Sequence, residues 1–137
     1  MTQKIRVLVA DDHPLVRQGL AAAISGETDI PIIGKASDGQ EAIDLTKRLS
    51  PEIVIMDVSM PHMSGITATK MLRSDFPEVR VIGLSMCSEE EGREMLKAGA
   101  VHYLNKTVSA STILEAIRDA ATKPNAVLVS CLPPAAV

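Results

Sequence analysis

The stretch that decides the fold is Ile53-Val54-Ile55-Met56-Asp57-Val58-Ser59-Met60-Pro61-His62-Met63-Ser64-Gly65. Its first four residues are apolar, which is typical of a strand buried on both faces of a parallel sheet. The run ends at a single carboxylate, Asp57, and Pro61 and Gly65 then favour a loop. Because open α/β sheets bind their ligands at the carboxyl ends of the strands, we predict that Asp57 belongs to a functional site.

The rest of the chain alternates strands with helices. Apolar runs predict four further strands, at residues 5–10, 30–36, 79–84 and 101–104. Apolar residues at helical spacing follow each strand, and four of the five helices are expected to end near Ser25, Pro51, Pro77 and Gly99. This alternation predicts an α/β fold, a flavodoxin-like (βα)5 three-layer sandwich whose parallel five-stranded sheet has the order 2-1-3-4-5.

Two helices of this pattern have informative details. Ser64 is expected to cap the helix that follows the central strand, because its hydroxyl can accept a backbone hydrogen bond. The helix that begins at Glu89 contains Gly92 in its interior and few apolar residues. We therefore expect that helix to be the least stable of the five.

Composition narrows the classes of function. The chain has 137 residues, and 46% are hydrophobic, which suffices for one domain with a core. Aromatic residues supply only 1%, which disfavours flavin and single-stranded nucleic acid, since both depend on ring stacking. The formal net charge of -3 and the lack of a run of Lys or Arg argue against direct DNA binding by this chain.

The ends of the chain and its cysteines suggest a location. No start resembling a signal peptide and no apolar run near the ~20 residues of a membrane span is visible, so we predict a soluble cytoplasmic protein without membrane contact. Cys87 and Cys131 are expected to be free thiols. The domain is expected to occupy residues 1–122. Residues 123–137 are expected to form an apolar tail that packs on the domain or on a partner, or a linker stub of a longer chain.

Carboxylates also follow the first strand. Asp11 and Asp12 come directly after residue 10, and the predicted strand order places them beside Asp57. Three carboxylates in one pocket repel one another unless a cation neutralises them, and Mg²⁺ prefers such hard oxygen ligands. One alternative is that Asp11 or Asp12 only caps the following helix. His13 borders this pocket, but the three histidines lack metal-ligand spacing, so we do not expect a metal role for them.

Ser85 and Lys106 follow the fourth and fifth strands and complete the same rim. Either residue alone would be an ordinary turn or surface residue. A carboxylate nucleophile, a cation, a lysine that balances charge and a hydroxyl that bonds a phosphate oxygen together suit phosphoryl transfer to Asp57. A nucleotide donor bound by this chain is disfavoured, because the sequence has no glycine-rich phosphate-binding motif.

From Lys4 to about Ala121 the chain resembles the receiver domains of two-component response regulators. The resemblance rests on four motifs, Val9-Ala10-Asp11-Asp12-His13, Met56-Asp57-Val58-Ser59-Met60-Pro61, Leu84-Ser85 and Tyr103-Leu104-Asn105-Lys106. The Asp-Asp-His-Pro start and the phrase Leu84-Ser85-Met86 are most similar to regulators of the NarL/FixJ kind, which carry a LuxR-type DNA-binding domain.

The resemblance implies a role for each of these residues. Asp57 would accept a phosphoryl group from a histidine kinase or phosphotransfer protein, Lys106 would pair with that group, and Ser85 would bond it. Tyr103 would turn inward and remodel the surface formed by the fourth helix, the fifth strand and the fifth helix, which could also form a homodimer. The implied Mg²⁺ ligands are Asp11 (through water), Asp12, Asp57 and the backbone carbonyl of Ser59. The domain would be a regulatory phosphoacceptor that catalyses only its own phosphorylation and dephosphorylation.

Several alternatives stay open. The chain could be a single-domain regulator, the receiver of a truncated DNA-binding regulator, or the receiver portion of a hybrid kinase. A pseudo-receiver that never takes phosphate is disfavoured, because Asp12, Asp57 and Lys106 are all present. A phosphatase that forms an aspartyl phosphate is disfavoured, because Ser59 stands where it needs a second aspartate. Cys87 stands where relatives often have histidine, and no helix-turn-helix is expected after the last helix.

Overall fold

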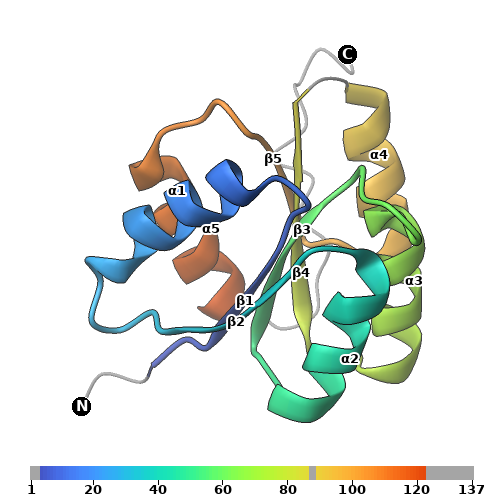
Figure 1. The fold of residues 1–137 in the computed structure, drawn as a ribbon, viewed down its shortest axis with the longest axis horizontal. Coiled ribbons are helices and arrows are strands. Elements are labelled where there is room, and N and C mark those ends of the chain that lie inside the picture. Colours follow the sequence, from blue (N-terminus) through green and yellow to red (C-terminus); the bar gives the residue numbers. More distant parts are fainter. Residues whose placement is uncertain (1–3, 87–88, 123–137) are drawn as a thin grey trace.

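A computed structural model describes residues 4–86 and 89–122, which form one parallel sheet with helices on both faces (Figure 1). The strands are β1 (Val7–Ala10), β2 (Ile32–Ala36), β3 (Ile53–Asp57), β4 (Arg80–Ser85) and β5 (His102–Asn105). The helices are α1 (Pro14–Ser25), α2 (Gly39–Leu49), α3 (Gly65–Asp75), α4 (Glu89–Ala98) and α5 (Ala110–Thr122). The strand order is β2-β1-β3-β4-β5, which confirms the predicted fold and topology.

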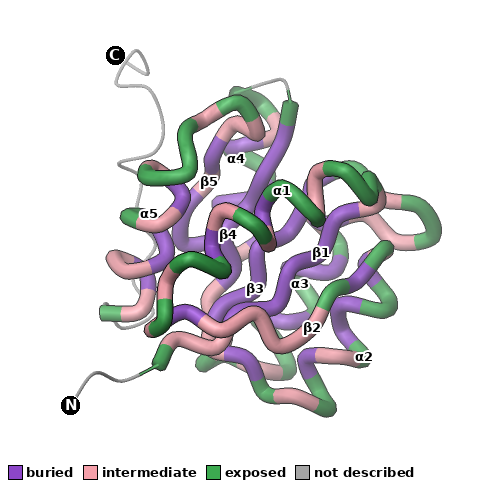
Figure 2. The backbone as a smooth tube through the Cα atoms, turned by 60° about the vertical axis from the view of Figure 1, so that its left-hand side comes forward, coloured by how far each residue is buried: buried purple, intermediate pink, exposed green. Residues whose placement is uncertain are grey.

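The helices form two layers, with α1 and α5 on one face of the sheet and α2, α3 and α4 on the other (Figure 1). Successive strand side chains point to opposite faces, so each central strand contributes to both cores. Ile53 and Ile55 pack in the cluster shared with α1 and α5, whereas Val54 and Met56 pack in the cluster shared with the other three helices. Figure 2 shows that the central strands are buried along their length, as the continuous apolar run of β3 predicts.

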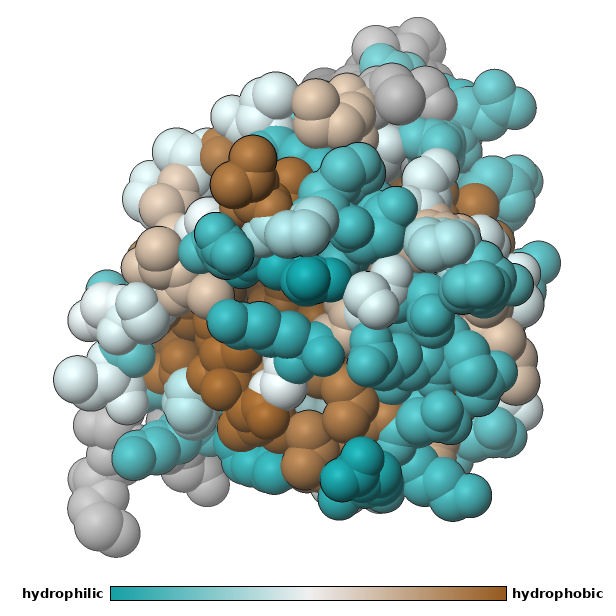
Figure 3. Space-filling model, in the orientation of Figure 1, coloured by the Kyte–Doolittle hydropathy of each residue, from teal (hydrophilic) through white to brown (hydrophobic). Residues whose placement is uncertain are grey.

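Strand ends differ from the predicted ranges by one or two residues. The first strand begins at Val7 rather than at residue 5, and the pairing of β1 with β2 shifts register between Val7 and Leu8. Ile5 still donates its backbone N–H to the carbonyl of Asp29, at 2.7 Å, but outside the regular ladder. At the sheet edge, β2 begins at Ile32, two residues after the predicted start. Hydrophobic side chains gather over β2 on the face of the molecule that Figure 3 shows, which is otherwise mostly hydrophilic.

Helix starts follow the local chemistry. The Ser64 hydroxyl accepts the N–H of Thr67 at 3.2 Å, which confirms the predicted cap of α3. The N-cap residue of α1 is His13, followed by Pro14 at the first helical position. The alternative in which Asp11 or Asp12 serves as that cap residue is therefore wrong.

The loop after β3 turns back sharply against the strand. Gly65 donates its N–H to the carbonyl of Val58 at 2.8 Å, and a Cβ at position 65 would lie 1.9 Å from the carbonyl oxygen of Asp57. Only glycine permits this approach, because any side chain would collide with the β3 backbone. Gly65 thus fixes the start of α3 beside the strand end that carries Asp57.

Within the described residues, no helix combines the length and the apolar character that a bilayer crossing requires. The predictions for Cys87, Cys131 and the segment 123–137 fall outside the described residues.

Candidate functional site

Three charged side chains meet at the carboxyl edge of the sheet, as the strand order predicts. Ala10 pairs with Met56, so Asp11 and Asp57 lie side by side at the ends of β1 and β3. Lys106 follows β5, and its Nζ lies 2.8 Å from Asp11 Oδ2 and 3.0 Å from Asp57 Oδ2. The side chains are 6%, 0% and 3% exposed for Lys106, Asp11 and Asp57. A single ammonium group therefore bridges two carboxylates that water scarcely reaches.

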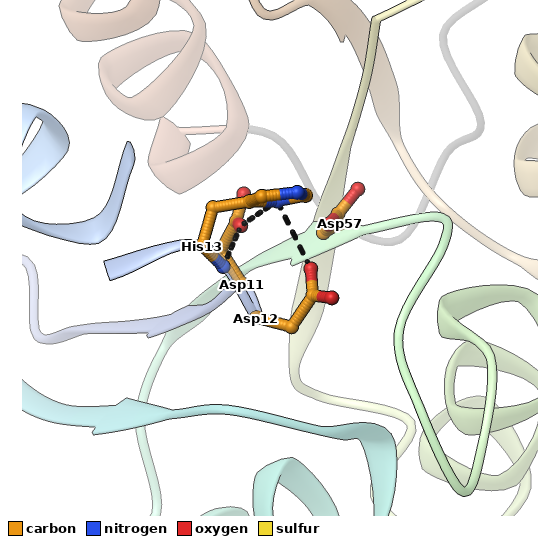
Figure 4. A group of neighbouring side chains, drawn as sticks. All are labelled: Asp11, Asp12, His13 and Asp57. Atoms are coloured by element: carbon orange, nitrogen blue, oxygen red, sulfur yellow. Dashed lines mark hydrogen bonds and ion pairs between the residues drawn. The ribbon is translucent and has the colours of Figure 1, made fainter. Parts of the chain in front are cut away.

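Asp12 and His13 lie next to Asp11 and Asp57 (Figure 4), and their side chains are more exposed than that of Asp11. His13 Nδ1 is 3.0 Å from Asp12 Oδ1 and 3.1 Å from Asp11 Oδ1. Ligand atoms of Asp11, Asp12, His13 and Asp57 all lie within 4.8 Å of one another. His13 therefore borders the acidic pocket, as its place next to Asp12 in the sequence predicts.

Burial dominates the electrostatics of Asp57. Loss of water raises the pKa of Asp57 to about 6, and the neighbouring Lys106 ammonium is the main opposing effect. The negative charge of Asp11 raises the pKa of Asp57 further, and the Ser59 N–H, 3.3 Å from Asp57 Oδ1, lowers it. For Lys106, burial acts to lower the pKa, but the two carboxylates outweigh burial and hold the pKa above its ordinary value.

The carboxylates retain unsatisfied oxygens. Asp11 Oδ2, Asp12 Oδ1 and Asp57 Oδ2 are buried and accept no hydrogen bond of good geometry from the residues that the structure describes. Lys106 and His13 lie within ion-pair distance of these oxygens, but a carboxylate oxygen has more lone pairs than one such neighbour occupies. Converging hard oxygens that need positive charge are the donor set that Mg²⁺ prefers, so the residues fit the predicted ion.

Ser85, which is predicted to bond the phosphoryl group, and Tyr103, the predicted switch residue, both contact α4. Ser85 ends β4 and is buried, and its hydroxyl donates a hydrogen bond to Glu91 Oε1. Tyr103 is half-buried, and its ring lies against Gly92, where an added Cβ would be 2.4 Å from the ring. Sequence reasoning missed Glu91, because an acidic residue in the first turn of a helix is favourable without any further role.

A family model described as the response regulator receiver domain matches residues 7–118. The chain belongs to this family. The transcriptional regulatory protein LiaR of Bacillus subtilis is 44% identical over 117 residues, which cover 85% of this chain and 56% of LiaR. The response regulator GacA of Pseudomonas viridiflava is 36% identical over 115 residues, which cover 83% of this chain and 54% of GacA. This receiver domain spans about half the length of the curated relatives it matches.

Solved structures agree with this assignment. The signal receiver domain of the putative response regulator NarL from Mycobacterium tuberculosis has a TM-score of 0.83 and 34% identity, covering 87% of this chain and 97% of that domain. The response regulator domain of Thermotoga maritima CheB has a TM-score of 0.83 and 35% identity, covering 88% and 98%. The predicted resemblance to receivers of LuxR- and NarL-type regulators is confirmed.

Proposed function

We propose that this receiver domain is switched by phosphorylation of Asp57, with the phosphoryl group supplied by a histidine kinase or phosphotransfer protein. The observation that supports this most directly is the buried bridge of Lys106 between Asp11 and Asp57. Such a bridge places a nucleophilic carboxylate beside a cation in a site where little water competes. Membership of the receiver family supports the same role.

In the proposed transfer, an Asp57 carboxylate oxygen attacks the phosphorus of a phosphohistidine on the donor. The new O–P bond forms as the P–N bond breaks, and the electron pair of the P–N bond leaves on the imidazole nitrogen. Asp57 has to be ionised to attack, which its pKa of about 6 allows at neutral pH. Lys106 Nζ, 3.0 Å from Asp57 Oδ2, balances the negative charge of the phosphoryl oxygens.

The proposed Mg²⁺ ligands are Asp11 (through water), Asp12, Asp57 and the backbone carbonyl of Ser59. When bound, Mg²⁺ would neutralise charge on the equatorial phosphoryl oxygens. Ser85 would donate its hydroxyl proton to one of these oxygens, and Tyr103 would respond by turning inward. The surface of α4, β5 and α5 would change with them.

The extent of the domain and its partners are also proposals. Residues 1–122 would be the receiver domain, and residues 123–137 a tail or linker stub. The domain would act in the cytoplasm as a regulatory phosphoacceptor, and its output would run through a protein contact, a homodimer of the α4–α5 face or an attached effector, with no direct DNA contact by this chain. A receiver portion of a hybrid kinase or of a truncated DNA-binding regulator would use the same site.

The test is the intact mass of the protein after incubation with acetyl phosphate and Mg²⁺. We expect one phosphoryl unit on the wild type, none on Asp57→Asn, and none on the wild type when EDTA removes the metal. Asp44→Asn, which changes an exposed carboxylate on α2, is the matched control and should be phosphorylated normally. Addition to Asp57→Asn would assign the acceptor elsewhere, and no addition to the wild type would favour a pseudo-receiver.

A further inference from the structure

Ser85 and Glu91 join the end of β4 to the first turns of α4. Ser85 is 3% exposed, and its hydroxyl donates a hydrogen bond to Glu91 Oε1. Glu91 is half-buried, whereas Glu89 and Glu90 in the same turn are exposed. Glu91 is therefore the member of the acidic run that turns toward the sheet.

The hydrogen bond to Glu91 and the proposed bond to a phosphoryl oxygen exclude each other. A serine hydroxyl carries a single proton, so it can donate one hydrogen bond at a time. A carboxylate can only accept, so the proton in the Ser85–Glu91 bond comes from Ser85. Ser85 must release Glu91 before it can donate to the phosphoryl group.

Gly92, the residue next to Glu91, lies against the predicted switch residue Tyr103. Gly92 is buried against the ring of Tyr103, and a Cβ there would come within 2.4 Å of the ring. Two consecutive residues of α4 thus contact Ser85 and Tyr103. A shift of this turn that releases Ser85 would also change the surface on which the Tyr103 ring rests.

From this arrangement we infer that Glu91 is a positioning residue that holds the resting state, because it competes with the phosphoryl group for the Ser85 proton. The inference rests on the proposed function and adds a residue that opposes activation of the domain. Removing the carboxylate removes this competitor for the Ser85 proton, so the activated state is reached more easily. Glu91 would then set how strongly the domain responds to a given level of phosphorylation.

The test uses the beryllium trifluoride anion, a phosphoryl mimic, in saturating Mg²⁺. Tyr103 is the only tyrosine in a chain without tryptophan, so its fluorescence reports binding at a switch residue directly. We expect Glu91→Ala to lower the half-saturating anion concentration about tenfold, since hydrogen bonds to charged groups are among the stronger ones. Glu90→Ala removes the same charge from the same turn and should leave that concentration within about twofold of wild type.

A second variant and a double-mutant cycle separate this role from general loosening of α4. Glu91→Gln keeps the side-chain shape and an oxygen acceptor, so it should give a smaller decrease than Glu91→Ala, and it serves as the test if Glu91→Ala does not fold. In a Ser85→Ala background, Glu91→Ala should change the half-saturating concentration no further. An equal decrease with and without the Ser85 hydroxyl would overturn the inference.

The two hypotheses fail in different ways. If the wild type binds the anion, Asp57→Asn does not, and neither Glu91 variant binds more tightly, only the role of Glu91 is wrong. If the wild type shows no binding in Mg²⁺, the proposed function fails and the role of Glu91 fails with it.

Discussion

Two ion clusters of this domain have the same charges in different surroundings. Each consists of one cation between two carboxylates, namely Lys106 with Asp11 and Asp57 at the sheet edge, and Arg118 with Glu27 and Asp29 on the surface. The first three side chains are at most 6% exposed, whereas Arg118 is 43% exposed. The clusters therefore differ mainly in access to water.

The pKa values of Asp57 and Asp29, one carboxyl group from each cluster, are shifted in opposite directions. Burial raises the pKa of Asp57 to about 6 in spite of Lys106, whereas the hydrogen bond from Arg118 lowers the pKa of Asp29. For Asp57, the cost of removing the negative charge from water exceeds the stabilisation by the neighbouring Lys106. Ionisation of Asp29 thus stabilises the folded state. Ionisation of Asp57 destabilises the folded state, and a further positive charge beside Asp57 would offset this.

The largest effect is expected when the buried cation is removed. Lys106→Met would leave two buried carboxylates without a cation and should lower the free energy of unfolding by about 3–5 kcal/mol near pH 8 in EDTA. Arg118→Met, the matched change in the surface cluster, should cost much less. Urea denaturation of both variants measures the difference. Equal losses for both variants would show that burial does not separate the two clusters.

Removal of a buried carboxylate should instead raise the free energy of unfolding. The pKa of Asp57 rises from 3.8 to about 6 on folding, so the native state binds more protons than the unfolded state between these pH values. Stability therefore falls as pH rises through this window, by about 3 kcal/mol in total. Asp57→Asn lacks this loss and should be more stable than wild type by about 2–3 kcal/mol near pH 8 in EDTA.

The measurement for Asp57→Asn is denaturant unfolding of both proteins in EDTA from about pH 4 to about pH 8. The difference between them should be small at the acidic end and grow with pH. Parallel pH profiles would mean that Asp57 keeps an ordinary pKa in the folded protein. Added Mg²⁺ should reduce the advantage of the variant, because the metal stabilises the ionised carboxylate.

The buried cluster could be predicted from sequence, because the geometry of a parallel sheet brings the ends of its strands together. Asp11, Asp57 and Lys106 each end or follow a strand, and parallel strands share one carboxyl edge whatever their separation in sequence. The same rule, with right-handed crossovers, gave the strand order that the structure confirms. Exact strand limits were less predictable, since they depend on the backbone pairing between strands, and the pairing of β1 with β2 is irregular between Val7 and Leu8.

Side-chain contacts between elements had no such rule. Arg118 and Asp29 are 89 positions apart on a helix and a loop, and no repeat of helix or strand geometry relates them. Gly92 is a second contact that the sequence did not predict. The sequence indicated only that glycine weakens α4, whereas in the structure the Tyr103 ring occupies the place of a side chain at position 92. The low stability of α4 itself stays a prediction.

The smallest effect is expected at Asp29, and its pH dependence should be opposite to that of Asp57. Its pKa is lowered on folding, so its stabilisation is present above the ordinary carboxyl pKa and is lost as pH falls. Asp29→Asn should lower the melting temperature slightly at neutral pH in low salt. The loss should vanish in acid and in concentrated salt, because the cluster is partly exposed and is screened by ions. Asp44→Asn controls for a change in net charge. If Asp29→Asn still lowered the melting temperature in concentrated salt, this cluster would be shielded from solvent. The difference between the two clusters would then have to come from their geometry and not from their access to water.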